Sequence, residues 1–213
     1  MKFDRNWLRV YAVTDRAWTG KMTLYEQVEE ALKGGVTMVQ LREKGLAGMG
    51  KEEFLKEARQ MRELTRRYQV PLLIDDDVET AIACGADGVH VGQNDMDAGL
   101  ARKLLGPDRI LGVTAKTPEQ AKKAQAQGAD YLGSGAIFGT STKADARPMT
   151  MEMLWDICRS VSIPVVAIGG ICLDNIDRLA GSGVAGAAIV SGIFGAEDIQ
   201  ETARKLLEHA KKL

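Results

Sequence analysis

The sequence predicts an α/β protein with a TIM barrel fold, a single (β/α)8 barrel domain over residues 1–213. Three observations lead to this prediction: short apolar runs alternate with helix-like segments, eight such pairs follow one another, and the connections are short. Alternation of this kind is typical of a parallel sheet covered by helices, and eight units in about 200 residues fit a compact barrel. A doubly wound open sheet is the competing fold. It normally has fewer strands in this length, and no G-x-G-x-x-G motif follows the first strand.

Each predicted strand is a short apolar run that polar or glycine residues bring to an end. The strands are predicted at residues 8–13, 36–41, 70–74, 88–91, 110–113, 131–133 as the start of the sixth, 164–168 and 187–190. The first predicted helix has apolar side chains at helical spacing, with Thr23 as a capping residue and Gly34-Gly35 as a stop, and the second has a long amphipathic pattern. The helices are predicted at residues 23–32, 51–68, 78–84, 97–105, 117–127, 151–160, 174–180 and 196–211.

A weak internal repeat supports the barrel. The segments GGVTMVQL, CGADGVHVG, QGADYLGSG and SGVAGAAIVSG share one form, in which a helix ends at glycine and an apolar strand soon follows. They precede strands two, four, six and eight, about 50 residues apart, so the repeating unit is two strand–helix modules. No linker or low-complexity segment interrupts the chain, which predicts one domain.

The composition excludes several classes of partner. The net charge of −1 argues against nucleic acid or a membrane recognised through bulk charge. No apolar run reaches the roughly 18 residues that span a bilayer, and the N-terminal segment MKFDRNWLRV lacks the apolar core of a signal peptide. The three cysteines, Cys84, Cys158 and Cys172, are scattered and indicate reduced thiols in a cytoplasmic protein.

In a barrel the chemistry belongs at the C-terminal ends of the strands, and polar residues gather there. After strand two comes Gln40-Leu41-Arg42-Glu43-Lys44, in which the amide and the two cations alternate and share one face of an extended chain. Two cations and an amide at the barrel mouth suit a polyanion such as diphosphate. The alternative is a solvated loop with ordinary surface charges.

Acidic residues follow the next two strands. Asp75-Asp76-Asp77 comes after strand three and a GQND segment ending in Asp95 after strand four, so a barrel would place the two loops side by side. Hard oxygen ligands from two loops suit Mg²⁺ bound together with substrate phosphates. The alternative is helix capping by Asp77 and by Asp95 or Asp97, which explains one aspartate per loop but not the surplus.

Three other stretches indicate phosphate binding. Gly169-Gly170 and Ser191-Gly192 follow strands seven and eight, where such barrels frequently bind phosphate through backbone N–H groups. The segment YLGSGAIFGTSTK at residues 131–143 ends in hydroxyls and Lys143, which suits a phosphate loop between the two anion sites, and a flexible surface turn is its alternative. The residues alone therefore indicate an enzyme that joins or splits two phosphorylated small molecules, one of them with Mg²⁺.

Neither histidine is predicted to be a catalyst. His90 is expected to pack within strand four, and His209 to lie on the exposed last helix.

The segments QLREKG, DDDVETA, ADGVHVGQNDMD, ILGVTAKT, GTSTK, AIGGI and IVSGIF resemble thiamine phosphate synthase, and YAVTDR near the N-terminus also matches. Their order and spacing cover nearly the whole chain. The resemblance implies a (β/α)8 barrel that couples 4-amino-2-methyl-5-hydroxymethylpyrimidine diphosphate to hydroxyethylthiazole phosphate, giving thiamine phosphate and pyrophosphate. The expected partners are therefore small-molecule substrates.

The resemblance also implies residue roles. The predicted catalytic residues are Arg42, Lys44 and Lys143, and the predicted Mg²⁺ ligands are Asp76 and Asp95. The substrate-binding set comprises Gln40, Leu41, Arg42, Glu43, Lys44, Asp75, Thr114, Thr140, Ser141, Thr142, Lys143, Gly170, Val190 and Ser191. Thr114 stands where the family usually has serine and keeps the hydroxyl. Asp75 is a departure, because many members have asparagine there, and a carboxylate beside a diphosphate adds repulsion unless a cation offsets it.

The implied mechanism is dissociative substitution, which needs no protein nucleophile and fits the absence of a Ser-His-Asp or Cys-His arrangement from the sequence. Two alternatives stay open. A thiazole tautomerase is a barrel relative with a similar phosphate cradle and would not need the aspartates at 76 and 95. A catalytically inactive phosphate-binding paralogue would act as a regulator. The retained aspartates and the pair Arg42 and Lys44 favour the synthase.

Overall fold

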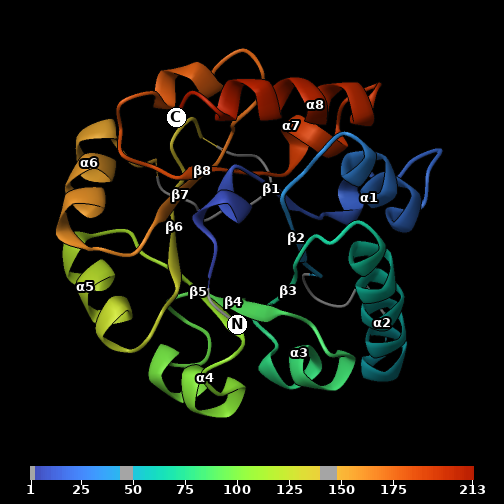
Figure 1. Ribbon diagram of the computed structural model, residues 1–213, viewed down its shortest axis with the longest axis horizontal. Coiled ribbons are helices and arrows are strands. Elements are labelled where there is room, and N and C mark those ends of the chain that lie inside the picture. The colour runs from blue at the N-terminus through green and yellow to red at the C-terminus, as the bar shows by residue number, and fades with distance from the viewer. Residues whose placement is uncertain (1–2, 44–49, 140–147) are drawn as a thin grey trace.

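The computed structural model describes residues 3–43, 50–139 and 148–213. Eight parallel strands close into a barrel in the order of the sequence, and helices surround it (Figure 1), so the predicted (β/α)8 barrel is confirmed. The strands are β1 Val10–Val13, β2 Met38–Leu41, β3 Leu72–Asp75, β4 Gly88–Val91, β5 Ile110–Thr114, β6 Tyr131–Gly135, β7 Val165–Ile168 and β8 Gly186–Ile189.

The helices lie between the strands in sequence and cover the outside of the barrel. They are α1 Leu24–Lys33, α2 Lys51–Arg67, α3 Val78–Cys84, α4 Ala98–Leu105, α5 Pro118–Ala126, α6 Met151–Ser160, α7 Ser191–Phe194 and α8 Ile199–Ala210, with 3₁₀ helices η1 Arg5–Leu8, η2 Arg16–Trp18 and η4 Ile176–Leu179. None of the described helices is both long and apolar enough to cross a membrane.

Two helix predictions are corrected. The helix expected at 174–180 is only the 3₁₀ helix η4, because Asn175 makes no capping bond and instead donates to the Gly170 carbonyl. The last helix begins at Ile199 rather than near residue 196, because the Asp198 carboxylate accepts the N–H of Glu201 at 2.8 Å and sets the first turn.

The register of neighbouring strands sorts their side chains into two layers. Tyr11 lies beside Met38, and both belong to the apolar cluster inside the barrel. Ala12 lies beside Val39, and both belong to the larger cluster that includes the inward faces of the helices. Because both faces of the strands are covered, the strands read as continuous apolar runs rather than as an alternating pattern.

The two-module repeat has a structural cause in the residue that precedes β2, β4 and β6. Thr37 accepts a hydrogen bond from the first N–H of β1 at 2.9 Å, Asp87 from the first N–H of β3 at 2.8 Å, and Asp130 from the second N–H of β5 at 2.7 Å. The two carboxylates are also paired with Arg62 of α2 at 2.9 Å and Arg102 of α4 at 2.6 Å. Each such residue joins two strands, and the carboxylates add a helix. The fourth segment has Ala185 before β8, so three of the four repeats share this bond.

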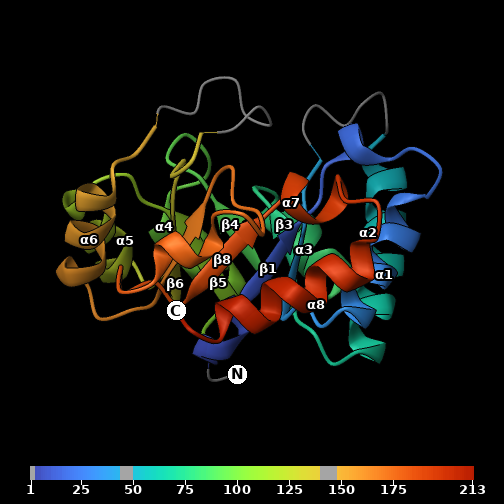
Figure 2. The same ribbon diagram turned by 90° about the horizontal axis from the view of Figure 1, so that it is seen from above.

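Aromatic side chains close the end of the barrel where the strands begin. Phe3 stacks on Tyr131 with ring centroids 5.7 Å apart, and Trp7 packs edge-on against Phe3 at 5.6 Å. The N-terminus lies on the side of the barrel opposite α7 (Figure 2). With this end filled, a ligand has to enter at the C-terminal ends of the strands.

We predict that Asp87→Ala destabilises the fold, because the first N–H of β3 and Arg62 both lose a partner. A hydrogen bond to a charged group contributes about 1.5–3 kcal/mol, so Tm should fall by about 3–12 °C in a thermal melt followed by circular dichroism. Glu79→Ala is the control. It removes an exposed pair with Lys51 at 2.7 Å and should change Tm by about 2 °C or less. Similar losses in the two variants would contradict the role given to Asp87.

Candidate active site

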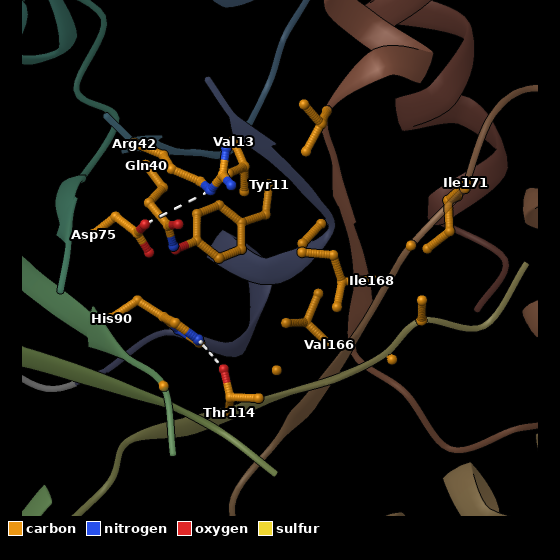
Figure 3. A pocket seen from close by; sticks show the side chains of 18 of the residues that line it. Tyr11, Val13, Gln40, Arg42, Asp75, His90, Thr114, Val166, Ile168 and Ile171 are labelled. Atoms are coloured by element: carbon orange, nitrogen blue, oxygen red, sulfur yellow. Dashed lines mark hydrogen bonds and ion pairs between the residues drawn. The ribbon is translucent and has the colours of Figure 1, made fainter. Parts of the chain in front are cut away.

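A cavity opens at the C-terminal ends of the strands (Figure 3). Nine residues predicted from the sequence to bind substrate or metal line it: Gln40, Arg42, Asp75, Asp76, Asp95, Thr114, Gly170, Val190 and Ser191. They come from segments that are far apart in the chain, and closure of the barrel brings them to one mouth.

Arg42 is held at this mouth through both its backbone and its guanidinium. Its N–H donates to Thr14 Oγ1 at 2.9 Å. Its Nη1 donates to Asp15 Oδ2 at 2.8 Å, and its Nε lies 3.7 Å from Asp75 Oδ2. The Arg42 and Asp75 side chains are 14% and 10% exposed, so water only partly screens the attraction (Figure 3). An anion entering the cavity would share or replace these carboxylate partners.

Asp76 and Asp95 both line the cavity from neighbouring loops. Asp76 has a φ of 61°, in the left-handed region that aspartate tolerates better than most residues, and its N–H donates to the His90 carbonyl at 2.8 Å. Asp95 Oδ2 accepts the N–H of Gly92 at 2.9 Å. Carboxylate oxygens are the ligands that Mg²⁺ prefers, so the chemistry of this donor pair fits the ion.

The number of carboxylates at the cavity indicates how a metal ion would be held. In residues 3–43, 50–139 and 148–213, no three His, Cys, Asp or Glu side chains are grouped closely enough to hold a metal ion. Mg²⁺ is usually bound by one or two carboxylates together with waters and substrate phosphates. The described residues therefore fit an ion held jointly with a phosphorylated ligand rather than an ion in a cage made by protein alone.

The loops after β7 and β8 are built from backbone rather than from charged side chains. Gly169 and Gly170 have φ angles of 105° and 64°, in the left-handed region that favours glycine. A Cβ at Gly170 would lie 2.4 Å from a backbone oxygen, and a Cβ at Gly192 would lie 2.3 Å from another. Close backbone packing of this kind suits a cradle in which N–H groups bind a phosphate, and Ser191 lines the cavity beside it.

Leu41 and Glu43 do not line the cavity, and their predicted role in substrate binding stays a prediction. Alternation along β2 is the cause, since Gln40 and Arg42 take the face toward the mouth. Leu41 is fully buried in the apolar layer under the helices. Glu43 accepts a hydrogen bond from Arg16 Nε at 2.7 Å, and burial raises the pKa of its carboxyl despite this cation.

Five predicted residues lie outside the described part of the chain: Lys44, Thr140, Ser141, Thr142 and Lys143. Their roles stay predictions from the sequence.

Three polar residues that were not predicted from the sequence to belong to the site line the cavity: Tyr11, His90 and Lys116. His90, expected only to pack within its strand, lies with its Nε2 3.0 Å from Thr114 Oγ1 (Figure 3). Lys116 follows Thr114 by two positions, so the alternation that picked out the residues after strand two would have found it here as well. Tyr11 has a different signal, as a hydroxyl within the otherwise apolar strand β1.

Comparisons with known proteins give related matches. A sequence model of the thiamine monophosphate synthase family matches residues 10–193. Thiamine-phosphate synthase of Ruminiclostridium cellulolyticum is 49% identical over 199 residues, 93% of each chain, and that of Clostridium acetobutylicum is 46% identical over 204 residues, 96% of this chain and 95% of the other. Among solved structures, thiamine phosphate pyrophosphorylase from Pyrococcus furiosus superposes with a TM-score of 0.88 at 39% identity, covering 97% of each chain.

We predict that Asp75→Asn strengthens the binding of inorganic pyrophosphate, measured by calorimetry with a chelator present. The change removes a negative charge next to Arg42 and leaves Asp15 as its carboxylate partner. For a partly solvated charge the gain is up to roughly 1 kcal/mol, a two- to five-fold lower Kd. Asp156→Asn, at an exposed position on α6, should leave the Kd unchanged. Weaker binding to Asp75→Asn would show that this carboxylate supports the anion instead of opposing it.

Proposed function

Because this chain belongs to the thiamine monophosphate synthase family, we propose that its cavity joins 4-amino-2-methyl-5-hydroxymethylpyrimidine diphosphate to hydroxyethylthiazole phosphate. The products are thiamine phosphate and pyrophosphate. The family resemblance read from the sequence is confirmed, and the chain is an enzyme of the transferase class in thiamine biosynthesis. The observation that carries the substrate assignment is the gathering of nine predicted residues around one cavity.

Joining the two substrates exchanges one covalent bond for another. The C–O bond between the pyrimidine methylene carbon and the diphosphate breaks, and both electrons leave with pyrophosphate. The electron-rich aminopyrimidine ring stabilises the carbocation, and the lone pair of the thiazole nitrogen forms the new C–N bond. No proton has to be removed, so the protein contributes charge stabilisation and alignment rather than a nucleophile or a general base.

We assign the departure of pyrophosphate to the charged side of the cavity. Arg42 and Lys116 are the cations that line it in the described part of the chain. The sequence adds Lys44 and Lys143 as further proposed contacts. Each positive charge lowers the energy of the transition state because negative charge grows on the leaving oxygen as the bond breaks.

We assign the thiazole phosphate to the glycine-built side. Gly170, Val190 and Ser191 line the cavity there, and Thr140 and Thr142 are proposed from the sequence to complete the set. This phosphate does not react, so backbone N–H groups and hydroxyls suffice to hold it while the thiazole nitrogen is aligned.

We also propose that residues 1–213 act as one domain, since all eight strands belong to one closed barrel. A cytoplasmic location is proposed on the cysteines, because Cys84, Cys158 and Cys172 are free thiols.

The decisive experiment is an assay with both substrates and Mg²⁺, which should yield thiamine phosphate and pyrophosphate in equal amounts. Arg42→Ala should lower kcat/KM for the pyrimidine diphosphate about ten- to hundredfold, since a charge-assisted contact contributes about 1.5–3 kcal/mol. Ser191→Ala should mainly raise KM for the thiazole phosphate, with less effect on kcat, because that phosphate is bound equally before and during the reaction.

The outcomes separate the competing functions. A thiazole isomerisation without release of pyrophosphate would indicate the tautomerase, and no turnover of either substrate would favour the inactive regulator. Equal effects of both variants on both substrates would contradict the division of the cavity into two anion sites.

We predict that Mg²⁺ binding depends on the diphosphate. Asp76 and Asp95 would hold the ion, which when bound neutralises charge on the leaving group. Because Mg²⁺ gives up its waters reluctantly, two carboxylates alone should bind it weakly. Calorimetry should therefore detect little Mg²⁺ binding to the protein alone and clear binding once pyrophosphate is present.

Asp95→Asn should weaken the binding of Mg²⁺ in the presence of pyrophosphate. Asp97→Asn should leave it unchanged, because the Asp97 carboxylate caps α4 through the Gly99 N–H at 3.0 Å. Micromolar affinity of the free protein for Mg²⁺ would contradict the shared site.

A further inference from the structure

A continuous chain of hydrogen bonds crosses the inside of the barrel. Gln40 Nε2 donates to the Tyr11 hydroxyl at 2.5 Å, and the hydroxyls of Tyr11 and Tyr131 are 2.9 Å apart. The Tyr131 hydroxyl lies 2.9 Å from His90 Nδ1, and His90 Nε2 lies 3.0 Å from Thr114 Oγ1. The chain therefore links β2, β1, β6, β4 and β5, and the residues at its two ends line the cavity.

The interior of the barrel is shaped to hold this chain. Tyr11 and Tyr131 are 1% and 0% exposed, so their hydroxyls depend on protein partners. A Cβ at Gly112 would lie 2.3 Å from the Tyr131 hydroxyl and 2.5 Å from His90 Nδ1, and a Cβ at Gly133 would lie 3.0 Å from His90 Cε1. Glycine at these positions of β5 and β6 leaves the space that the contact between Tyr131 and His90 occupies.

The direction of the chain follows from counting protons. Burial raises the pKa of Tyr11 and that of Tyr131, so each hydroxyl keeps its one proton at neutral pH. Tyr11 accepts from Gln40 and so donates to Tyr131, and Tyr131 then donates to His90 Nδ1. This order requires a neutral imidazole with its proton on Nε2, which then donates to Thr114 Oγ1.

We propose that this chain fixes the polarity of the cavity, with the Gln40 carbonyl presented as an acceptor and the Thr114 hydroxyl as a donor, and that it selects an aminopyrimidine over the corresponding oxo ring. The proposal rests on the function proposed above, in which the ring carries an amino group. An amino group donates to a carbonyl, and a ring nitrogen accepts from a hydroxyl. An oxo group beside a protonated ring nitrogen reverses both roles. A buried polar group without a matching partner gives strong discrimination.

Tyr131 is the residue that isolates this effect. It is not among the residues that line the cavity, so it acts on a ligand through Tyr11 and His90 and is a positioning residue. Without the Tyr131 hydroxyl, Tyr11 loses its acceptor and is able to donate to Gln40 instead. The side-chain amide of Gln40 can then rotate by half a turn at little cost in free energy, and His90 is no longer held in one tautomer.

The direction of the chain is tested on the protein without ligand. The sequence contains two histidines, so ¹⁵N NMR with labelled imidazoles gives two sets of ring signals, and His209→Gln assigns them. His90 should be the neutral Nε2–H tautomer in the wild type and should lose this fixed tautomer in Tyr131→Phe. A wild-type His90 with its proton on Nδ1, or with both nitrogens protonated, would overturn the proposal.

The selectivity is tested by calorimetry with 4-amino-2-methyl-5-hydroxymethylpyrimidine diphosphate and its 4-oxo counterpart in the presence of Mg²⁺. The wild type should bind the amino compound at least about tenfold more tightly, and Tyr131→Phe should reduce the ratio of the two Kd values about tenfold. Ile110→Val is the matched control. Ile110 is buried in the same inner apolar cluster as Tyr11 and Tyr131, but it belongs neither to the chain of hydrogen bonds nor to the cavity lining. This variant should therefore lower Tm and leave the ratio of the two Kd values unchanged.

An unchanged ratio in Tyr131→Phe, or an equal fall in Ile110→Val, would overturn the proposal. If Tyr131→Phe fails to fold, Tyr11→Phe interrupts the same chain one bond nearer to Gln40 and should reduce the ratio too. Failure of both compounds to bind the wild type would refute the proposed function and with it the selection of ligand. The tautomer of His90 would then still decide whether the hydrogen bonds run from Gln40 as the first donor to Thr114.

Discussion

The hydrogen bond between the hydroxyls of Tyr11 and Tyr131 is the interaction on which the interior of this barrel depends. It joins β1 to β6, two strands that are not neighbours in the sheet, and the two rings meet edge to face with centroids 5.9 Å apart. The bond lets two bulky side chains fill the barrel without leaving a buried hydroxyl unsatisfied. Each hydroxyl also contacts a residue of the cavity lining, Gln40 or His90. The packing of the interior therefore sets the hydrogen-bonding groups of the mouth.

In the proposed function the mouth binds two anions by different physical means. On one side Arg42 supplies a full charge that two carboxylates already orient. Charge of this kind is most effective where negative charge develops during the reaction, as on a departing pyrophosphate. On the other side Gly169 and Gly170 supply closely packed backbone in place of charged side chains. A phosphate that stays attached throughout needs orientation more than added charge, so the division fits a reaction in which one phosphate group leaves and the other is carried.

Local chemistry decided which features the sequence could predict. The caps at Thr23 and Asp77 involve residues three positions apart. The predicted cap at Thr23 is confirmed, and Asp77 caps α3 as the alternative to metal binding had it. The barrel followed from the number and alternation of strand–helix units. The helix expected at 174–180 was wrong because Asn175 bonds to a carbonyl five positions back instead of capping. The chain through Tyr11 and Tyr131 could not be predicted, since those residues are 120 positions apart and meet only when the barrel closes.

Asp75 shows what the family resemblance by itself leaves open. Many members of the family have asparagine there, and a carboxylate repels a diphosphate unless a cation offsets it. In the structure Asp75 lies 3.7 Å from the Arg42 guanidinium. Its charge also adds to the larger effect of burial in raising the pKa of Tyr11 and of Tyr131. One carboxylate thus offsets Arg42 in the absence of an anion, and it lies close enough to the buried tyrosines to add slightly to the effect of burial on their pKa. Because burial alone keeps both hydroxyls protonated, the main consequence of the carboxylate at position 75 is the charge that it places beside Arg42.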